Sequence, residues 1–321
     1  MKRTCLLITE RLEPTADLLI AELRRRDVPC VRWNLDQFPL GSTLTYRASN
    51  SSFTAEISTD GRRVNLDTIA SIWCRRFRPS GLPTNLGATD RKFAETEARR
   101  ALDALMTITK VVWINHPQRQ ALANSKPAQL FMARQVGLEI PLTVITNNPE
   151  EANEFAAASG RVTIYKTMSQ TLVLEPGKAL FTGVLARKEL ANLELIRVSP
   201  GIFQELVPKS YEVRATVVGR QIFSGKISSQ ASEETEIDWR HGPFDIEDRP
   251  IQLPHDVEAG IHAVMEGFGL VYGAFDFIVT PEGRHIFLEV NPAGHYMWVE
   301  TKTGLPITSA IADALSRPCL E

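Results

Sequence analysis

The sequence predicts a mixed fold, in which an N-terminal α/β domain precedes a larger α+β part. The chain opens with a buried strand, an amphipathic helix and a second strand, which together make a βαβ unit. Its middle alternates helices with strands, and its last third is dominated by strands. With 321 residues, 43% of them hydrophobic, the chain is long enough for about two domains with a sizeable core.

The first domain is expected over residues 1–115. Its βαβ opening is read from TCLLITE, from PTADLLIAELRRR with Pro14 near the start of the helix, and from PCVRWNLDQF. No GxGxxG follows the first strand, so a dinucleotide site is not expected. The strand-like stretches LTYRAS, FTAEIS and RVNLD come next, then ASIWCRRFRPS, a long helix from about Asp90 to Thr109, and the strand-like VVWINHP.

The second domain is expected over residues 116–321, with its first clear element near Asn124. The helix SKPAQLFMARQVG, closed by Gly137, leads to the strand PLTVIT, the helix PEEANEFAAAS and the strand RVTIYKT. The strands GIFQELV, EVRATVVG and QIFSGKISSQ follow, then a helix from about Pro254 to Gly267 and the strands VYGAFDFIVT and HIFLEV. Strands with helices on one side predict an α+β arrangement.

Charge and composition exclude several classes of partner. The 36 basic and 38 acidic residues give a net charge of −2, so neither nucleic acid nor an anionic membrane is an expected partner. No apolar stretch approaches the roughly 20 residues of a membrane span, and acidic residues interrupt the N-terminus too early for a signal peptide. The cysteines are scattered without CxxC spacing, which predicts a cytoplasmic protein with reduced thiols: Cys5, Cys30, Cys74 and Cys319.

Oxygen-bearing side chains gather near the end of the chain, in VYGAFDFIVTPEGRHIFLEVNP. The turn PEG joins two strands as a hairpin, which can bring Asp276 beside Glu289. Asn291 lies two positions after Glu289 and therefore shares its face of the strand. One alternative is a satisfied polar end of a hairpin. The three oxygen donors together favour a magnesium site, because Mg²⁺ takes few protein carboxylates and leaves positions for phosphate oxygens.

Cationic and acidic positions upstream suit a nucleotide. Lys126 lies at the start of a helix, where free amide donors favour anions, and Lys166 ends the strand VTIYK. For each lysine the alternative is a solvated side chain. The stretch FQELV offers alternating backbone acceptors and donors to an adenine edge, and in the following EVR we expect Glu212 to hold ribose hydroxyls and Arg214 a phosphate.

In chain order this constellation resembles the ATP-grasp family, from about residue 115 to the end. The positions that carry the resemblance are Lys126, Lys166, the hinge Gln204-Glu205-Leu206-Val207, Glu212-x-Arg214, Asp276 and Glu289-x-Asn291. The resemblance implies an ATP-grasp fold preceded by a pre-ATP-grasp domain. It also implies the ligand assignments: phosphates on Lys126 and Lys166, adenine on Glu205 and Val207, ribose on Glu212, and two Mg²⁺ ions on Asp276, Glu289 and Asn291.

The sequence departs from the family pattern in one segment. Many ATP-grasp enzymes carry a glycine-rich flap after the second lysine, whereas this chain has KTMSQTLVLEPGKALFTG. Ser169 and Thr171 are the donors that we expect to replace the flap over the phosphates.

Finer features resemble the macrocyclising maturases of ribosomal peptides, the microviridin or graspetide ligases, in their actinobacterial version. They are SIWCRRFRPS, KTM, YEVRATVVGRQIFSGKISSQ followed by IDWR, and NPAGHYMWVE. The resemblance implies an ATP-dependent ligase that activates Asp or Glu side chains of a precursor peptide as acyl phosphates. A hydroxyl or amine of the same peptide then closes an ester or amide ring. The implied partners are the leader and core of that precursor, and the expected assembly is a homo-oligomer, a dimer or a tetramer.

Further roles are expected at the reacting centre. Lys166 and Arg214 would neutralise charge on the transferring phosphoryl group. Arg75 and Arg76 would seat the substrate carboxylate, although alternation along the strand sends them to opposite sides. For this basic stretch the alternative is a solvated loop. The residues expected to contact the peptide are Arg78, Lys226, Asp238 and Arg240, with an internal salt bridge as the alternative for the last two.

Four more positions are interpreted as structural. His295, Tyr296 and Trp298 follow the strand of the metal site and are expected to act as lid or packing groups. His116, in NHP, is interpreted as part of a turn.

Two other functions remain as alternatives. A glutathione-synthetase-like or ribosomal-protein-modifying ligase of the same fold would join free amino acids or extend a protein tail. A nucleotide-binding regulator without catalysis is the third possibility, and the complete Asp/Glu/Asn set argues against it. A neighbouring gene for a short peptide with repeated Thr and acidic residues would favour macrocyclisation over the other ligases.

Overall fold

The computed structural model describes residues 4–158, 162–168, 173–175, 178–179, 183–185, 192–228 and 249–317. Its N-terminal part is built on a parallel four-stranded sheet in the order β2-β1-β6-β7. The strands are β1 (Thr4–Thr9), β2 (Cys30–Asn34), β6 (Ile69–Cys74) and β7 (Val112–Ile114). Helix α1 (Pro14–Arg25) joins β1 to the parallel strand β2, which confirms the expected βαβ opening.

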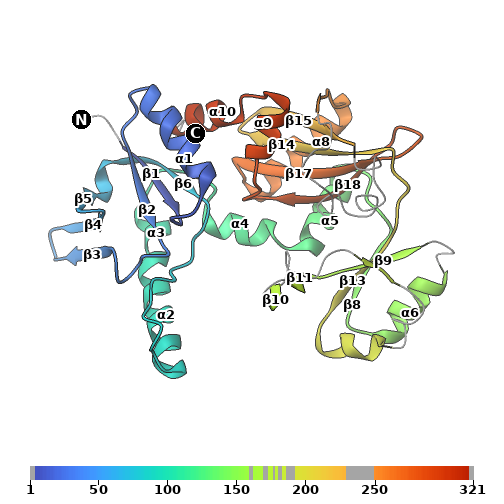
Figure 1. The fold of residues 1–321 in the computed structure, drawn as a ribbon, viewed down its shortest axis with the longest axis horizontal. Coiled ribbons are helices and arrows are strands. Elements are labelled where there is room, and N and C mark those ends of the chain that lie inside the picture. The colour runs from blue at the N-terminus through green and yellow to red at the C-terminus, as the bar shows by residue number, and fades with distance from the viewer. Residues whose placement is uncertain are drawn as a thin grey trace.

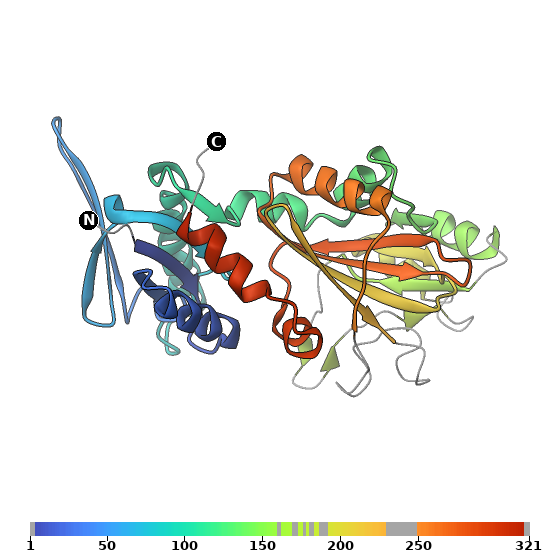
Figure 2. The same cartoon turned by 90° about the horizontal axis from the view of Figure 1, so that it is seen from above.

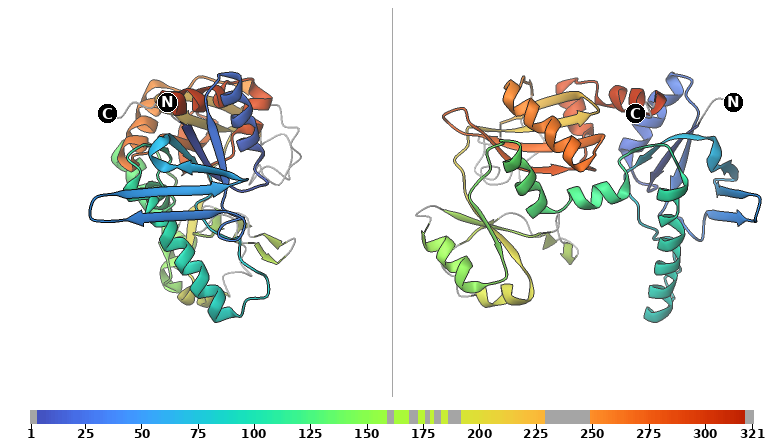
Figure 3. Two further views of the ribbon diagram at one scale, coloured as in Figure 1. Left: turned by 90° about the vertical axis from the view of Figure 1, so that its left-hand side faces the viewer. Right: turned by 180° about the vertical axis from the view of Figure 1, so that it is seen from behind.

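Two elements project from this sheet. An antiparallel ribbon of β3 (Thr43–Ala48), β4 (Phe53–Thr59) and β5 (Arg62–Asn65) extends away from the body, as Figure 2 and the left view of Figure 3 show. Helix α2 (Ala88–Asp103) also projects (Figure 1), and α3 (Leu105–Ile108) follows it. The single helix expected here is thus divided at one residue.

The C-terminal part contains a larger antiparallel sheet in the order β16-β15-β14-β17-β18. Its strands are β14 (Tyr211–Val218), β15 (Gln221–Ile227), β16 (Arg249–Pro250), β17 (Tyr272–Val279) and β18 (His285–Asn291). Helix α8 (His255–Phe268) covers one face and is seen in front of the sheet in the right view of Figure 3. Alternate strand residues such as Val213, Ala215 and Phe275 pack against it, so their neighbours in sequence face the other way.

A smaller antiparallel sheet lies below the larger one in Figure 1, in the order β12-β9-β13-β8. Its strands are β8 (Thr143–Thr146), β9 (Thr163–Lys166), β12 (Gly183–Val184) and β13 (Gly201–Glu205). Helix α6 (Pro149–Ala158) and the short helix η2 (Leu193–Val198) bury one face against Phe203. A separate strand pair, β10 (Val173–Glu175) and β11 (Lys178–Ala179), belongs to the segment that replaces the glycine-rich flap.

Four helices connect or join these parts. Helix α4 (Pro117–Ala123), which the sequence analysis missed, leads into the expected helix α5 (Lys126–Gln135), and α9 (Met297–Thr303) and α10 (Ile307–Ser316) end the described chain. Helix α10 lies beside α1 (Figure 2) and shares one hydrophobic core with it, β6 and the larger sheet. No helix in the described part of the chain is both long and apolar enough to cross a membrane.

Candidate functional site

A row of charged side chains crosses three strands of the larger sheet. The strand register pairs Arg214 with Asp276 and Asp276 with Glu289. Because Val213 and Ala215 face α8, the row lies on the opposite face of the sheet. This arrangement confirms the expected hairpin and the side-by-side placing of its two carboxylates.

Each carboxylate of the row is held by a cation. Nη1 of Arg214 lies 2.8 Å from both carboxylate oxygens of Asp276, and Nζ of Lys126 contacts Oε2 of Glu289. Lys126 is the first residue of α5, as expected. The guanidinium of Arg214 also lies 5.8 Å from the ring centre of Trp298. Two cations that the sequence analysis assigned to phosphates therefore neutralise the two carboxylates assigned to metal.

The oxygen donors of the row fit magnesium. Asn291 shares the face of Glu289, and its Oδ1 accepts a hydrogen bond of 3.0 Å from the backbone of Ala293. Two carboxylates and one amide oxygen are hard ligands in the small number that Mg²⁺ takes from proteins. Within the described residues no group of three or more His, Cys, Asp and Glu side chains could hold a metal, so the amide would supply the third protein oxygen.

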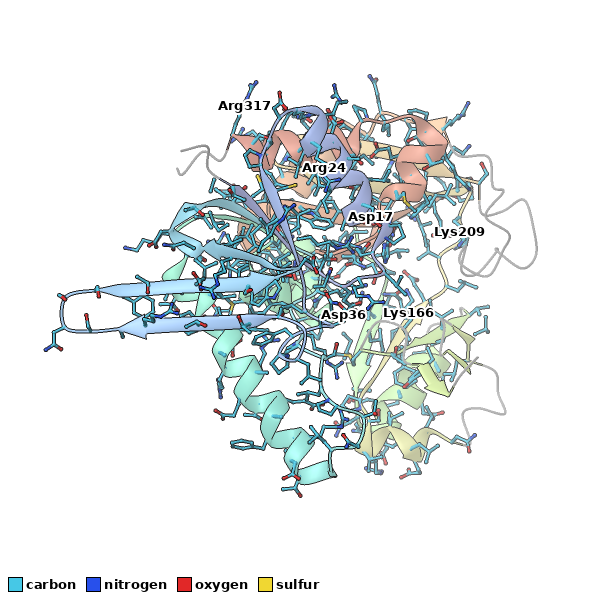
Figure 4. All side chains as sticks on the ribbon, turned by 60° about the vertical axis from the view of Figure 1, so that its left-hand side comes forward. Asp17, Arg24, Asp36, Lys166, Lys209 and Arg317 are labelled. Atoms are coloured by element: carbon cyan, nitrogen blue, oxygen red, sulfur yellow. The ribbon has the colours of Figure 1, made fainter. Side chains whose placement is uncertain are left out.

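Glu212 has a partner that the sequence analysis missed. Its Oε1 lies 2.6 Å from Nζ of Lys209, and both side chains are buried, at 7% and 5% exposure. Lys209 lies in the segment that connects the smaller sheet to the larger one (Figure 4). The signal was present in the sequence, because Lys209 precedes Glu212 by three residues in PKSYEVR. A buried ion pair thus holds the carboxylate assigned to ribose.

The smaller sheet carries the second lysine. Lys166, labelled in Figure 4, ends β9 as expected. Its Nζ donates a hydrogen bond of 2.7 Å to Oε1 of Gln204. Gln204 in turn donates to Oγ1 of Thr143 at 2.8 Å. The register places Lys166 opposite Ile202, whereas Phe203 packs toward α6. Lys166 and Gln204 therefore lie on the sheet face that α6 leaves free.

The hinge Gln204-Glu205-Leu206-Val207 leaves β13 at Glu205. The backbone N–H of Glu205 donates to the carbonyl of Leu142 at 3.0 Å, and Oε1 of the same residue accepts from the backbone of Leu142 at 3.0 Å. The N–H of Leu206 donates to the carbonyl of Val162 at 2.8 Å. These bonds fix the path of the hinge, and the adenine contacts of Glu205 and Val207 stay a prediction.

The arginines after β6 differ in burial. Arg75 is buried, Arg76 is half-buried and Arg78 is exposed. Nη1 of Arg75 donates to the carbonyls of Ala293 and Gly294, and its Nη2 lies 3.1 Å from Nδ1 of His295. Its Nε lies 3.7 Å from Glu13. Arg75 thus directs its donors at the chain itself, which differs from the expected open seat for a substrate carboxylate.

The remaining predicted positions lie away from the charged row or outside the described residues. Lys226 is paired with Val213 in the register and therefore lies on the face opposite Arg214, with its Nζ 4.4 Å from the ring centre of Tyr211. Tyr296 is fully buried in a core, which confirms a packing role, and His116 precedes α4 at its N-cap position. Ser169, Thr171, Asp238 and Arg240 lie outside the described residues.

Two buried amides that the sequence analysis missed hold the metal strands in place. Nδ2 of Asn115 donates to the carbonyls of Tyr272 and Pro292, at 2.7 and 2.8 Å. Nε2 of Gln129 donates to the carbonyl of Val290 at 2.8 Å, and its Oε1 accepts from the backbone of the same residue at 3.1 Å. Asn115 therefore ties the N-terminal part to β17 and β18, and Gln129 ties α5 to the residue after Glu289.

Comparisons with known proteins find a matching family model and several similar solved structures. The family model described as the MvdD pre-ATP grasp domain matches residues 4–121. Macrocyclase MdnC of Microcystis aeruginosa MRC, solved with its precursor peptide MdnA, is 32% identical with a TM-score of 0.88, covering 98% of this chain and 99% of its own. A RiPP-associated ATP-grasp ligase of Chryseobacterium gregarium, solved with ADP and with a leader and core peptide, is 29% identical with a TM-score of 0.89, over 98% and 96% of the two chains. Macrocyclase MdnB of M. aeruginosa MRC is 29% identical with a TM-score of 0.84, over 98% and 99%. No curated protein sequence matches.

Proposed function

The chain belongs to the ATP-grasp macrocyclases of ribosomal precursor peptides, and from this membership we propose how its residues perform the reaction. We propose that the enzyme phosphorylates an Asp or Glu side chain of the precursor with ATP. A hydroxyl or amine of the same peptide then attacks the acyl phosphate, so that an ester or amide bond closes the ring and phosphate leaves.

The row of Arg214, Asp276 and Glu289, with Lys126, is the observation that carries this proposal. A carboxylate resists attack because of its negative charge and its poor leaving group, so a phosphoryl group must first be attached. Phosphoryl transfer is catalysed mainly by positioning and by neutralising charge. Arg214, Asp276 and Glu289 lie on one sheet face, Lys126 of α5 contacts Glu289, and the second lysine, Lys166, donates to Gln204 at the start of the hinge.

The cofactors follow from the same residues. Asp276, Glu289 and Asn291 would hold two Mg²⁺ ions, which supply positive charge at the β- and γ-phosphate oxygens of ATP. Lys126, Lys166 and Arg214 would then exchange their present partners for phosphate oxygens. Glu205 and Val207 would contact the adenine, and Glu212 the ribose. The Chryseobacterium relative was solved with ADP, which supports nucleotide binding.

The peptide is proposed to bind at two places. Arg76 and Arg78 would meet the acidic side chain of the core, because Arg75 is engaged with the chain itself. Asp238 and Arg240, with Lys226, would bind the leader, since a flexible substrate needs affinity remote from the reacting group. The relatives solved with precursor or leader and core peptides support a peptide partner.

Intact-mass measurement after incubation with a precursor from the same gene neighbourhood, ATP and magnesium tests the proposal. Each ring should remove the mass of one water, and hydroxylamine should divert the acyl phosphate to a hydroxamate. Unchanged peptide mass with every neighbouring precursor would contradict macrocyclisation.

Binding of the leader is tested separately. Asp238→Ala or Arg240→Ala should weaken binding of labelled leader peptide far more than binding of ATP. Equal leader affinity in both variants would contradict that assignment.

A cytoplasmic homo-oligomer, a dimer or tetramer, completes the proposal. Within the described residues Cys5, Cys30 and Cys74 are free thiols, and reduced thiols are typical of the cytoplasm. Large apolar side chains are exposed on the N-terminal part, and a second subunit would cover them: Leu12, Leu40, Phe53 and Phe93. Light scattering coupled to size-exclusion chromatography gives the mass of the particle, and a monomeric mass would contradict the assembly.

A further inference from the structure

His295 lies shortly after Asn291, in the loop that follows β18. It follows Gly294 in the loop after β18, where Nη1 of Arg75 donates to the Gly294 carbonyl at 2.9 Å. Nη2 of Arg75 lies 3.1 Å from Nδ1 of His295. The loop and the ring are thus held by one guanidinium, and the ring is held through one of its two nitrogens.

This contact determines the tautomer of the ring. A guanidinium has only donors, so Nδ1 must accept the hydrogen bond from Arg75 and the neutral ring must carry its proton on Nε2. Burial, followed by the positive charge of Arg75, lowers the pKa of His295, while Glu13 opposes the shift and Arg76 and Arg214 contribute to it. The ring is therefore neutral at pH 7, with an N–H on its second nitrogen.

Glu13 fixes the guanidinium in turn. The side chains of Glu13 and Arg75 are 5% and 4% exposed, and Oε2 of Glu13 lies 3.7 Å from Nε of Arg75. Burial disfavours the charge of Glu13, but Arg75, the hydrogen bond from Thr15 and the nearby His295 and Arg76 together outweigh it, so the pKa of this carboxyl is lowered below its ordinary value. This buried ion pair and the carbonyls of Ala293 and Gly294 together orient Arg75, and Arg75 orients the imidazole.

The side of the His295 ring that carries Nε2 is exposed to solvent. The His295 side chain is 57% exposed although its Nδ1 is engaged. The charge of Arg214 is near enough to contribute to the lowered pKa of His295, and Arg214 binds Asp276 in the row. The Nε2–H edge is therefore the polar group that the ring offers to a substrate at this site.

We infer that His295 is a catalytic hydrogen-bond donor, which presents Nε2–H to the acyl oxygen of the peptide during ring closure, and that Arg75 and Glu13 are positioning residues for it. The inference rests on the proposed function. The peptide hydroxyl or amine forms a bond to the acyl carbon, the bond from that carbon to the phosphate oxygen breaks, and phosphate leaves with the electron pair and takes the nucleophile's proton. His295 keeps its own proton and stabilises the negative charge that grows on the acyl oxygen.

Two amide substitutions separate the roles of the ring nitrogens. The amide nitrogen of glutamine reaches the position of Nε2, whereas that of asparagine reaches only the position of Nδ1. His295→Asn should lower kcat for ring closure about 100-fold, with little change in KM for the peptide, while His295→Gln should recover most of that loss. His255→Asn, at the exposed start of α8, is the matched control. Thermal melting of each variant excludes a folding defect.

A spectroscopic measurement tests the tautomer without turnover. In enzyme labelled with ¹⁵N-histidine, the shifts of His295 should report a protonated Nε2 and a bare Nδ1 from pH 8 down to about 6.5, the ordinary histidine pKa, and Arg75→Met should abolish this preference. A protonated Nδ1 in the native enzyme, or ring closure by His295→Asn at the wild-type rate, would overturn the inference alone. Failure of the native enzyme to close any ring would overturn the proposed function and the catalytic role of His295 with it.

Discussion

In the larger sheet the charged side chains of the site are bound by opposite charges, whereas in the smaller sheet Lys166 donates to the neutral amide of Gln204. The larger sheet holds Arg214 on Asp276, and Lys209 on Glu212. These groups are at most 15% exposed, so their attraction is weakly screened. In the smaller sheet the charged Nζ of Lys166 lies 2.7 Å from Oε1 of Gln204, the oxygen of an uncharged amide.

This difference between the two sheets indicates that their cations are held in two ways before a nucleotide binds. A cation held by a carboxylate is already oriented, but it must give up that partner, or share it, when a phosphate or a metal arrives. A lysine held by an amide loses less when it turns to a phosphate. We therefore expect substitutions in the most buried ion pairs of the larger sheet to lower stability, and substitutions in the smaller sheet to affect nucleotide binding and transfer.

The largest effect is expected for Glu289→Gln. The change keeps the shape of the side chain but removes one charged metal ligand, so turnover should fall about 1,000-fold or more. The melting temperature should stay close to that of the wild type, because the apolar face of β18 is untouched. Ring formation followed by intact mass measures the loss, and full activity would contradict the metal assignment. Glu139→Gln, at an exposed ion pair with Arg284, is the control.

Breaking the buried pair of Lys209 and Glu212 should cost stability. Lys209→Met leaves the carboxylate of Glu212 in a buried site without that cation, which should lower the free energy of unfolding by about 3 kcal/mol. Denaturant unfolding measures this loss, and the double variant with Glu212→Leu should recover part of it. Arg284→Met, in the exposed pair with Glu139, should cost less than about 1 kcal/mol. Similar losses in the two single variants would remove the distinction between buried and exposed pairs.

Lys166→Ala should separate chemistry from folding. Loss of its charge should weaken ATP binding and slow phosphoryl transfer about 100-fold, while unfolding should change less than in the fully buried pairs, because Lys166 is only half-buried. Calorimetric titration of ATP and the rate of ADP release give the two quantities. Unchanged affinity and rate would show that another cation binds the phosphates.

The cation on Glu289 should act against metal binding when nucleotide is absent. Lys126 occupies Oε2 of this carboxylate, so Mg²⁺ alone must displace a positive charge. In Lys126→Met the affinity for Mn²⁺ without nucleotide, followed by electron paramagnetic resonance, should rise about 10-fold, a factor that corresponds to about 1.4 kcal/mol. Weaker Mn²⁺ binding in the variant would instead mean that the lysine organises the site.

The smallest effect concerns acid stability where the N-terminal part meets the loop after β18. The pKa of Glu13 is lowered in the folded chain, because Arg75 and the smaller contributions of Thr15, His295 and Arg76 together outweigh the effect of burial. The pair therefore contributes fully above the unfolded pKa, and this contribution is lost as the pH falls through the folded pKa. Thermal melting between pH 6 and pH 3, values that bracket the ordinary pKa of Glu, should show a shallower decline for Glu13→Gln. Parallel curves would contradict a charged Glu13.

The hairpin of the site could be predicted because local patterns determine it. The turn PEG and the alternation around Asp276 and Glu289 fix a register within one short segment. The helix starting at Lys126 and the strand ending at Lys166 were likewise marked by apolar periodicity and by flanking glycine and proline. Resemblance supplied the order of the site residues along the chain.

What the sequence analysis missed depends on contacts between distant segments. Asn115 and Gln129 satisfy backbone groups of β17 and β18, and nothing near them in sequence shows which backbone they meet. The internal engagement of Arg75 likewise depends on a loop 218 residues away. Helix α10 did leave a signal, since Ile307, Ile311 and Leu315 recur at four-residue spacing, but its packing partner could not be read from that pattern.

Helix α10 also limits how such ligases can be recombined. Its apolar side chains lie in one core with Leu19 and Leu23 of α1, and Ser71 of β6 donates to the Leu315 carbonyl at 2.8 Å. The N-terminal sheet is therefore completed by the far end of the chain. A chimera that exchanges residues 1–115 between two relatives would join one parent's sheet to the other parent's helix. We expect more of these chimeras to fold, and so to exchange substrate preference, when residues 305–317 are taken from the same parent as residues 1–115.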